Sequence, residues 1–158
     1  MRVEQLMSKQ VKSCSPEDTL DAAARLMWDN DCGCVPVCTR DGLDRAVGVI
    51  TDRDICMAAM FQGKPLRDLR VSDAMCKKLQ ICGPRDSLGE AERIMREARI
   101  RRLPVVDEQG GLIGMITLAD LAREAARERT TARQEITETE VGDTLAAICQ
   151  SAGQRLAA

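Results

Sequence analysis

Two segments, Gly48-Val-Ile-Thr-Asp-Arg-Asp54 and Gly114-Met-Ile-Thr-Leu-Ala-Asp120, decide the fold of this 158-residue chain. Both run glycine, two apolar residues, threonine, two variable residues and aspartate. The doubling extends toward the N-terminus, where Pro36 and Pro104 are 68 positions apart and five earlier residues, beginning at Met7, recur at the same distance. The chain therefore contains two copies of one supersecondary unit, and two such units can bury their apolar faces against each other.

The offset between the copies falls to 66 at the two threonines, so the first copy has two extra residues in its polar run 39–45. A hairpin loop tolerates such an insertion. We therefore expect an α/β fold in two pseudo-symmetric halves. The expected boundaries are 1–66 for repeat one, 67–126 for repeat two and 127–158 for a C-terminal helical tail.

Each copy reads as strand, helix, strand, strand and helix. In the first copy, Asp18 or Thr19 can cap a helix whose apolar face recurs at helical spacing and which ends near Asn30. The other expected elements of the two copies are strands at 11–14, 34–38, 46–50, 79–82, 103–106 and 112–116, and helices at 51–61, 87–98 and from 117.

The tail has two parts. The run 123–133 is charge-dense and is expected to continue the last helix as a solvated segment. Beyond it, the apolar residues Val141, Leu145, Ile148, Ala152 and Leu156 keep a helical spacing. Such a helix covers either its own domain or a second protomer, and the competing interpretation for the final residues is a frayed end.

Composition excludes several classes of function. The chain has no histidine, which removes histidine-dependent catalysis and histidine-ligated metals. Its net charge is −2 and its only aromatic residues are Trp28 and Phe61, which argues against nucleic acid as a partner. No apolar run is long enough to span a membrane, and the N-terminus lacks a signal-peptide pattern. We expect a cytoplasmic protein.

The eight cysteines do not form a recognisable metal motif. Cys32, Cys34 and Cys38 are clustered, but zinc and iron–sulfur sites usually combine paired C-x2-C segments, which are missing here. Buried free cysteine acts as a small apolar side chain, and this interpretation is favoured. A redox or metal role for the cluster stays open.

The doubled motif suggests a ligand as well as a helix cap. Thr-x-x-Asp at a helix start is the pattern of a capping box, and a single occurrence would be read as that alone. Here Thr51 and Asp54, and again Thr117 and Asp120, follow a glycine and two apolar residues. A helix N-terminus and a threonine hydroxyl suit a phosphate, while a carboxylate can accept hydrogen bonds from ribose hydroxyls. The motif therefore favours a nucleoside phosphate.

This arrangement resembles the CBS domain family, named for the regulatory region of cystathionine β-synthase. The resemblance covers roughly residues 1–125 and rests on the segments Val35-Pro36-Val37 and Leu103-Pro104-Val105 together with the doubled threonine–aspartate motif. It implies two β-α-β-β-α repeats packed as an intramolecular pair, often called a Bateman module. It also implies adenosine ligands in the clefts between the repeats.

The resemblance further implies which residues bind. The threonine and aspartate of each motif contact phosphate and ribose, and the backbone of the first strand and of the segment before the proline frames the base. Arg53, inside the first motif, is a natural phosphate partner. The expected ligand-binding residues are Ser13, Cys14, Val35, Pro36, Thr51, Arg53 and Asp54 at one site, and Gln80, Ile81, Leu103, Pro104, Thr117 and Asp120 at the other.

The two expected sites differ in charge. The second motif has Leu118 and Ala119 between its threonine and aspartate, so we expect this site to bind more weakly or to stay empty. Arg99, Arg101 and Arg102 precede the second proline segment. They can reach a phosphate across the pseudo-twofold axis or form a solvated helix end, and the sequence supports both interpretations equally.

The expected function is regulatory rather than enzymatic, with no catalytic or metal-binding residues. The ligand would be AMP, ADP, ATP, S-adenosylmethionine or a related adenosyl compound, and no cofactor is obligatory. The expected partners are this small molecule, a second copy of the chain in a homodimer, and a protein that the sequence does not identify. The alternatives are a cysteine-based redox or metal sensor and a ligand-free dimerisation scaffold.

Overall fold

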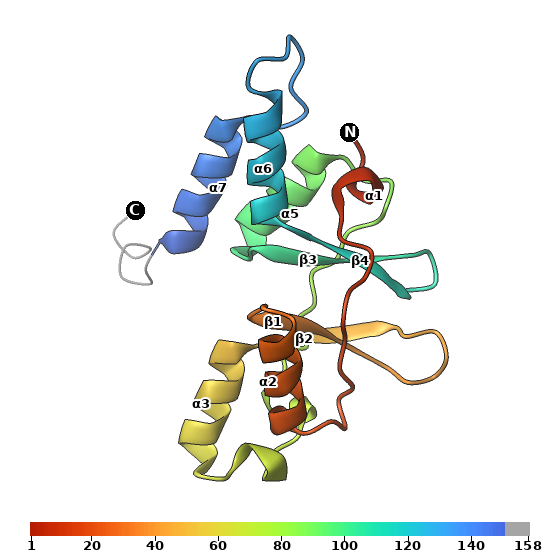
Figure 1. Ribbon diagram of the computed structural model, residues 1–158, viewed down its shortest axis with the longest axis vertical. Helices are drawn as coiled ribbons and strands as arrows, with labels where there is room; N and C mark the ends of the chain where they lie inside the picture. Colours follow the sequence, from red (N-terminus) through yellow and green to blue (C-terminus); the bar gives the residue numbers. More distant parts are fainter. Residues whose placement is uncertain (151–158) are drawn as a thin grey trace. The chain divides into compact units, whose positions relative to one another are not determined.

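The computed structural model describes residues 1–150, which form two compact units (Figure 1). The first-repeat unit consists of residues 10–79 and 106–113. The second-repeat unit consists of residues 1–9, 80–105 and the chain from 114 onward. Each unit therefore holds one copy of the threonine–aspartate motif with the strands and helices around it.

The first-repeat unit contains the elements of the first copy. They are α2 (Leu20–Asp29), β1 (Cys34–Cys38), β2 (Ala46–Thr51), α3 (Asp52–Gln62), the 3-10 helix η1 (Leu66–Asp68) and the short α4 (Val71–Ala74). The second-repeat unit contains α1 (Val3–Leu6), α5 (Leu88–Ala98), β3 (Arg102–Val106), β4 (Leu112–Thr117), α6 (Leu118–Glu128) and α7 (Glu138–Cys149), while the tip of the β3–β4 hairpin belongs to the first-repeat unit. The structure thus confirms a mixed helix and strand fold with two small antiparallel sheets.

Polar caps fix where the helices begin. The Thr19 hydroxyl accepts a hydrogen bond from the Ala22 N–H at the start of α2, and Ser87 does the same for Glu90 in α5. Each cap satisfies a backbone donor that has no partner inside the helix. The expected cap at Thr19 and the expected end of this helix at Asn30 are confirmed.

The first strand of each copy is shorter than expected. Instead of the predicted strands 11–14 and 79–82, only Cys14 and Cys82 form bridges, pairing in parallel with Val37 and Val105. A proline follows two positions later in each copy and ends the extended segment. In β1, Pro36 is accommodated although it lacks an N–H, because its carbonyl still accepts from the Cys14 N–H at 3.1 Å.

The segment that precedes each copy packs in the unit of the other copy. The Val71 N–H, at the start of α4, donates to the Asp18 carbonyl at 2.9 Å in the first-repeat unit. The Val3 N–H, at the start of α1, donates to the Asp86 carbonyl at 2.9 Å in the second-repeat unit. Val3 and Val71 are both fully buried. The compact units therefore interleave along the sequence, while the expected repeat boundaries at 66 and 126 stay predictions.

The glycine of each motif is required by the backbone that passes it. A Cβ at Gly48 would lie 2.8 Å from the carbonyl oxygen of Cys76, and one at Gly114 would lie 3.0 Å from that of Ser8. Cys76 follows the segment that begins at Val71 and pairs with β2, and Ser8 follows the segment that begins at Val3 and pairs with β4. The close approach of main chain explains both glycines without a ligand.

The tail differs from its expectation. The helix α6 ends at Glu128 instead of continuing to Arg133, and Glu124 and Glu128 on it are buried rather than solvated. The Glu128 carboxylate accepts a hydrogen bond from the Glu135 N–H at 2.7 Å, which holds the turn between α6 and α7. A capping box at Thr137 and Glu140 then starts α7.

The expected apolar stripe is not the buried face of α7. The fully buried residue of this helix is Thr144, whereas Leu145 is 46% exposed. The helix packs against α5 and α6 of its own unit, as Figure 1 shows. The stripe residues Ala152 and Leu156 lie outside the described residues. No helix within 1–150 is both long and apolar enough to cross a membrane.

Candidate ligand-binding sites

The first motif closes as a capping box at the start of α3. The Thr51 N–H and hydroxyl donate to Oδ2 of Asp54 at 2.9 and 2.7 Å, and the Asp54 N–H donates to the Thr51 hydroxyl oxygen at 3.2 Å. Asp54 is half-buried, and among residues 1–150 its other oxygen, Oδ1, has no hydrogen-bonding partner. One carboxylate oxygen is thus held in place and the second is available to an incoming donor.

The second motif repeats this geometry at the start of α6. The Thr117 N–H and hydroxyl donate to Oδ2 of Asp120 at 2.8 and 2.7 Å. Here the second oxygen is occupied, because Arg123 donates to Asp120 Oδ1. Asp120 is only 5% exposed, while the guanidinium of Arg123 reaches it from solvent. A ligand that uses this oxygen must first displace the arginine.

The capping geometry alone does not identify a ligand site. Thr137 and Glu140 of α7 lie outside both copies, yet they form the same three hydrogen bonds at 2.8, 2.7 and 3.2 Å. The motif residues therefore have a structural role wherever they occur. Any argument for a ligand must rest on what surrounds the two motifs.

The first-repeat unit brings its expected site residues together. Cys34 lies opposite Thr51 in the β1–β2 ladder, so the neighbouring Val35 and Pro36 lie beside the motif. On the other side of β1, the Cys38 N–H donates to the Cys14 carbonyl at 2.8 Å, which places the segment with Ser13 against this strand. Cys14, Val35 and Pro36 are buried, and Ser13 is exposed.

The second-repeat unit has the same arrangement, but two of its residues lie one position later in the sequence than expected. The Cys82 N–H donates to the Pro104 carbonyl at 3.1 Å, as Cys14 does to Pro36. The structural counterparts of Ser13 and Cys14 are therefore Ile81 and Cys82, whereas the expected pair was Gln80 and Ile81. The 68-residue offset applied to Cys14 identifies Cys82 directly, so this signal was present in the sequence.

The expected site residues of the second-repeat unit are otherwise in comparable places. Leu103 and Pro104 are buried in β3, Thr117 ends β4, and Asp120 lies in the first turn of α6. Gln80 is half-buried and Ile81 is exposed ahead of the bridge at Cys82.

The two sites carry their arginines on different elements. In the first-repeat unit the Asp52 N–H donates to the Gly33 carbonyl at 3.2 Å; in the second, the Leu118 N–H donates to the Arg101 carbonyl at 2.9 Å. Arg101 thus occupies the position of Gly33. Arg53, which belongs to the first motif, is exposed and forms no ion pair within 1–150. An arginine that the second motif lacks between its threonine and aspartate thus stands directly before β3.

A cavity of about 400 Å³ lies beside the second motif. Its polar side is formed by Thr117 and by Arg101 and Arg102, both of which are exposed. Its apolar side is formed by residues of α6 and by Val141 and Leu145 of α7. A volume of this size falls in the range of small-molecule sites. Arg101 and Arg102 line this cavity in their own unit, and both interpretations of the arginines stay predictions.

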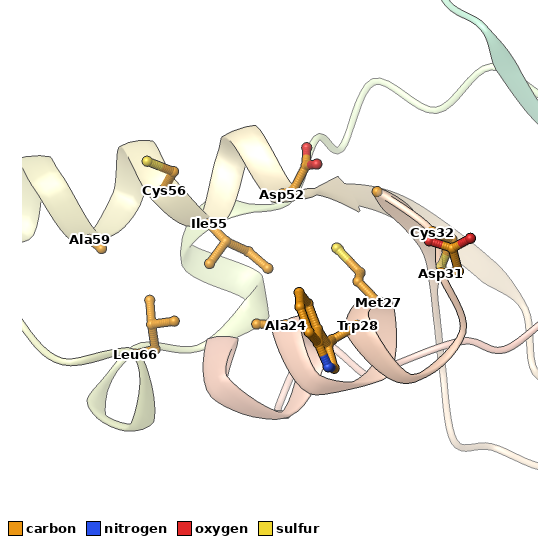
Figure 2. A pocket seen from close by; sticks show the side chains of 11 residues that line it. Ala24, Met27, Trp28, Asp31, Cys32, Asp52, Ile55, Cys56, Ala59 and Leu66 are labelled. Carbon is orange, nitrogen blue, oxygen red and sulfur yellow. The ribbon is translucent and has the colours of Figure 1, made fainter.

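The cavity of the first-repeat unit, about 650 Å³, is lined in part by Gly33, Asp52 and Cys56, which are the counterparts of Arg101, Leu118 and Ala122. It separates α2 from α3, and Figure 2 shows Trp28 and Met27 on α2 facing Ile55 on α3. Asp52 lines it, but the expected site residues Thr51 and Asp54 do not. We therefore treat this cavity as a groove between helices and not as the site of the first motif.

The cysteine cluster does not fit a metal or a reactive thiolate. Within residues 1–150, no three or more cysteine, aspartate, glutamate or histidine side chains are grouped so that they could hold a metal ion. Cys34 and Cys38 are buried in β1. Burial raises the pKa of the Cys38 thiol, and burial together with Asp18 raises that of Cys14 to about 12. These thiols stay protonated at neutral pH, which makes them poor nucleophiles and ligands.

Comparison with known proteins identifies the family. The family model described as "CBS domain" matches residues 3–60 and again 71–127. The chain belongs to the CBS domain family. Among curated CBS relatives, "CBS domain-containing protein YhcV" of Bacillus subtilis is 38% identical over 120 residues, which cover 76% of this chain and 82% of YhcV.

One relative is an enzyme of which this chain resembles only a part. Inosine-5'-monophosphate dehydrogenase of Methanocaldococcus jannaschii is 32% identical over 133 residues, which cover 81% of this chain and 25% of the enzyme. The chain therefore spans about a quarter of that protein's length. The likeness does not extend to the remaining three quarters of the enzyme.

Solved structures show the same fold. Hypoxic Response Protein I, described with two coordinated zinc ions, is 31% identical, has a TM-score of 0.70 and covers 78% of this chain, which covers 98% of it. CBSX2 in complex with AMP is 26% identical with a TM-score of 0.69, covering 81% and 98%. The CBS domain pair of MJ0100, bound to 5'-methylthioadenosine and S-adenosyl-L-methionine, has a TM-score of 0.69 at 22% identity, covering 78% and 94%.

Proposed function

We propose that this CBS protein is a regulatory module that binds adenosine-containing nucleotides and has no catalytic activity of its own. The observation that carries the proposal is the arrangement at the starts of α3 and α6. In both units a threonine and an aspartate form a capping box at a helix N-terminus, with Arg53 in the first turn of α3 and Arg101 lining the cavity beside Thr117. The complexes of CBSX2 with AMP and of MJ0100 with adenosyl compounds support the class of ligand.

Each proposed site is built from the residues of one unit. In the first, Asp54 Oδ1 accepts from the ribose hydroxyls while Arg53 and the Thr51 region hold the phosphate, with Val35 near the base. In the second, Asp120 and Thr117 have these roles and Arg101 replaces Arg53. A charge-assisted hydrogen bond to the aspartate contributes about 1.5–3 kcal/mol, and an exposed arginine contributes less, so the aspartate dominates the expected affinity.

The experiment that tests the proposal is mass spectrometry of small molecules released when the purified protein is denatured. We expect AMP, ADP, ATP or S-adenosylmethionine. A thermal-shift series with the same compounds should then raise the melting temperature by about 5–10 °C at a hundredfold excess over the dissociation constant. Neither release nor shift would favour the ligand-free scaffold, and bound zinc or iron would favour the metal sensor.

A homodimer is part of the same proposal. Trp28 on α2 is 87% exposed and lines the groove between α2 and α3. A large exposed side chain beside an apolar groove is typical of an interaction surface. We place the second copy on this face, and Trp28→Glu should convert a dimer measured by light scattering into a monomer.

We further propose a cytoplasmic location and a downstream protein partner.

A monomeric wild type at micromolar concentration would contradict the proposed homodimer. It would not contradict the proposed nucleotide sites, because each of them is built from residues of one unit.

A further inference from the structure

We propose that α7, which lies beyond both CBS repeats, is part of the second nucleotide site and sets its affinity. This inference rests on the proposed function, because it concerns the ligand held at Thr117 and Asp120. The family match ends at residue 127, and α7 spans Glu138–Cys149. The helix therefore lies outside the residues that the family model matches.

The first argument is position. Thr117 shares one cavity of about 400 Å³ with Val141 and Leu145, which lie one helical turn apart on α7. A molecule bound at the start of α6 that extends into this cavity must contact the side chains of α7.

The second argument is chemistry. Arg101 and Arg102 stand on the polar side of the cavity, and Leu118, Ala119, Val141 and Leu145 form its apolar side. A nucleotide has the matching division, with an anionic phosphate at one end and a flat, largely apolar base at the other. We assign the phosphate to the arginines and the face of the base to Val141 and Leu145.

The third argument is how α7 is held. Thr144 is fully buried, and its hydroxyl donates to Glu92 of α5, itself only 5% exposed. Arg96 lies 3.6 Å from the same carboxylate. One polar anchor fixes the helix, while Val141 stays partly exposed and Leu145 is 46% exposed instead of packing into the core. Apolar side chains left along a cavity wall are free to be covered by a ligand.

A matched pair of substitutions tests the inference. Leu145→Ala removes wall contact from a residue that is 46% exposed, and Leu43→Ala makes the same change at a residue that is 49% exposed in the β1–β2 loop. Both are introduced together with Asp54→Ala, so that binding reports the second site. With the tightest of AMP, ATP and S-adenosylmethionine, Leu145→Ala should weaken binding roughly fourfold to fifteenfold, the effect of one or two methylene groups. Leu43→Ala should leave it unchanged.

Hydrogen exchange gives a second readout. The same compound should slow amide exchange in residues 141–149 of the wild type and should fail to do so in Asp120→Ala. Equal affinities of the Leu145 and Leu43 variants, or unchanged exchange in α7 on binding, would overturn the role of α7 while leaving the nucleotide function intact. If none of the three compounds binds the wild type, the proposed function fails, and the inference fails with it.

Discussion

The two CBS repeats share a hydrogen-bonded frame and differ in the side chains placed on it. In both, a backbone carbonyl approaches the glycine of the motif so closely that a side chain would collide with it. In both, the threonine hydroxyl donates to the aspartate of the capping box at 2.7 Å. The arginine, however, lies inside the motif at Arg53 in one repeat and before the strand at Arg101 in the other. A repeat can thus move a charge between elements without disturbing the backbone that positions it.

The two units also differ in what covers their helices. In the second-repeat unit α7 packs on α5 and α6, and Thr144 bonds to Glu92. The residue that corresponds to Glu92 by the 68-residue offset is Ala24, which lines the open groove between α2 and α3. We propose that the covered face provides an extra wall for a ligand site and that the open face is a surface for a second copy of the chain.

The largest expected effect concerns the shared frame. Leu20 and Leu88 begin α2 and α5 and are essentially fully buried. Replacing either by alanine should lower the free energy of unfolding by about 2–5 kcal/mol, because it removes apolar contact and leaves a cavity. Urea denaturation of both variants measures this. A cost below about 1 kcal/mol in one repeat alone would show that the two cores are not equivalent.

The next effect separates ligand binding from capping. Asp54→Ala and Asp120→Ala should each weaken nucleotide binding at their own site about tenfold to a hundredfold, through loss of a charge-assisted hydrogen bond. Thr19→Ala removes the helix cap at the start of α2, away from both motifs and from α7, and serves as the control in calorimetry. If all three variants bind equally well, the aspartates act as caps alone.

A smaller effect tests the relocated arginine. Arg53→Ala and Arg101→Ala should each reduce affinity for AMP about two- to tenfold, since exposed charges contribute about 0.5–1.4 kcal/mol. Adenosine, which lacks the phosphate, should bind both variants as it binds the wild type. An equal loss for adenosine and AMP would place these arginines away from the phosphate. The expectation that the second site binds more weakly stays a prediction. It is based on the absence of an arginine between Thr117 and Asp120, and the presence of Arg101 in the neighbouring cavity must be weighed against that absence.

The smallest difference between the repeats is expected in the reactivity of two corresponding thiols, Cys14 and Cys82. Burial raises the pKa of both Cys14 and Cys82 to about 12, so both stay protonated at pH 8, while Cys56, Cys76 and Cys149 are exposed. Alkylation followed by mass spectrometry should modify the exposed thiols first. The stabilising effect of the protonated thiols should be complete below about pH 9 and be lost as the pH rises toward 12, because the unfolded chain releases these protons earlier. Preferential alkylation of Cys14 would contradict its raised pKa, and preferential alkylation of Cys32, Cys34 or Cys38 would support the redox interpretation.

Much of the fold follows from the sequence because its signals are local. Helix caps, prolines and the 68-residue offset predict the helices, the hairpins and the grouping of Cys14, Pro36 and Thr51. The exchange of the segments at Val3 and Val71 depends on which buried surface accepts each valine, and local patterns do not carry that information. The same holds for Arg101 and Arg123, whose roles depend on the path of the chain before β3 and on one turn of α6.

The central claim is that each repeat binds an adenosine nucleotide through its own threonine–aspartate motif. Isothermal titration of AMP, ATP and S-adenosylmethionine into the wild type and into the double variant Asp54→Ala/Asp120→Ala tests it most directly. The account predicts saturable binding of at least one compound to the wild type, and loss of that binding in a double variant that is still folded. Unchanged binding in the double variant, or none of the three bound by the wild type, would contradict it.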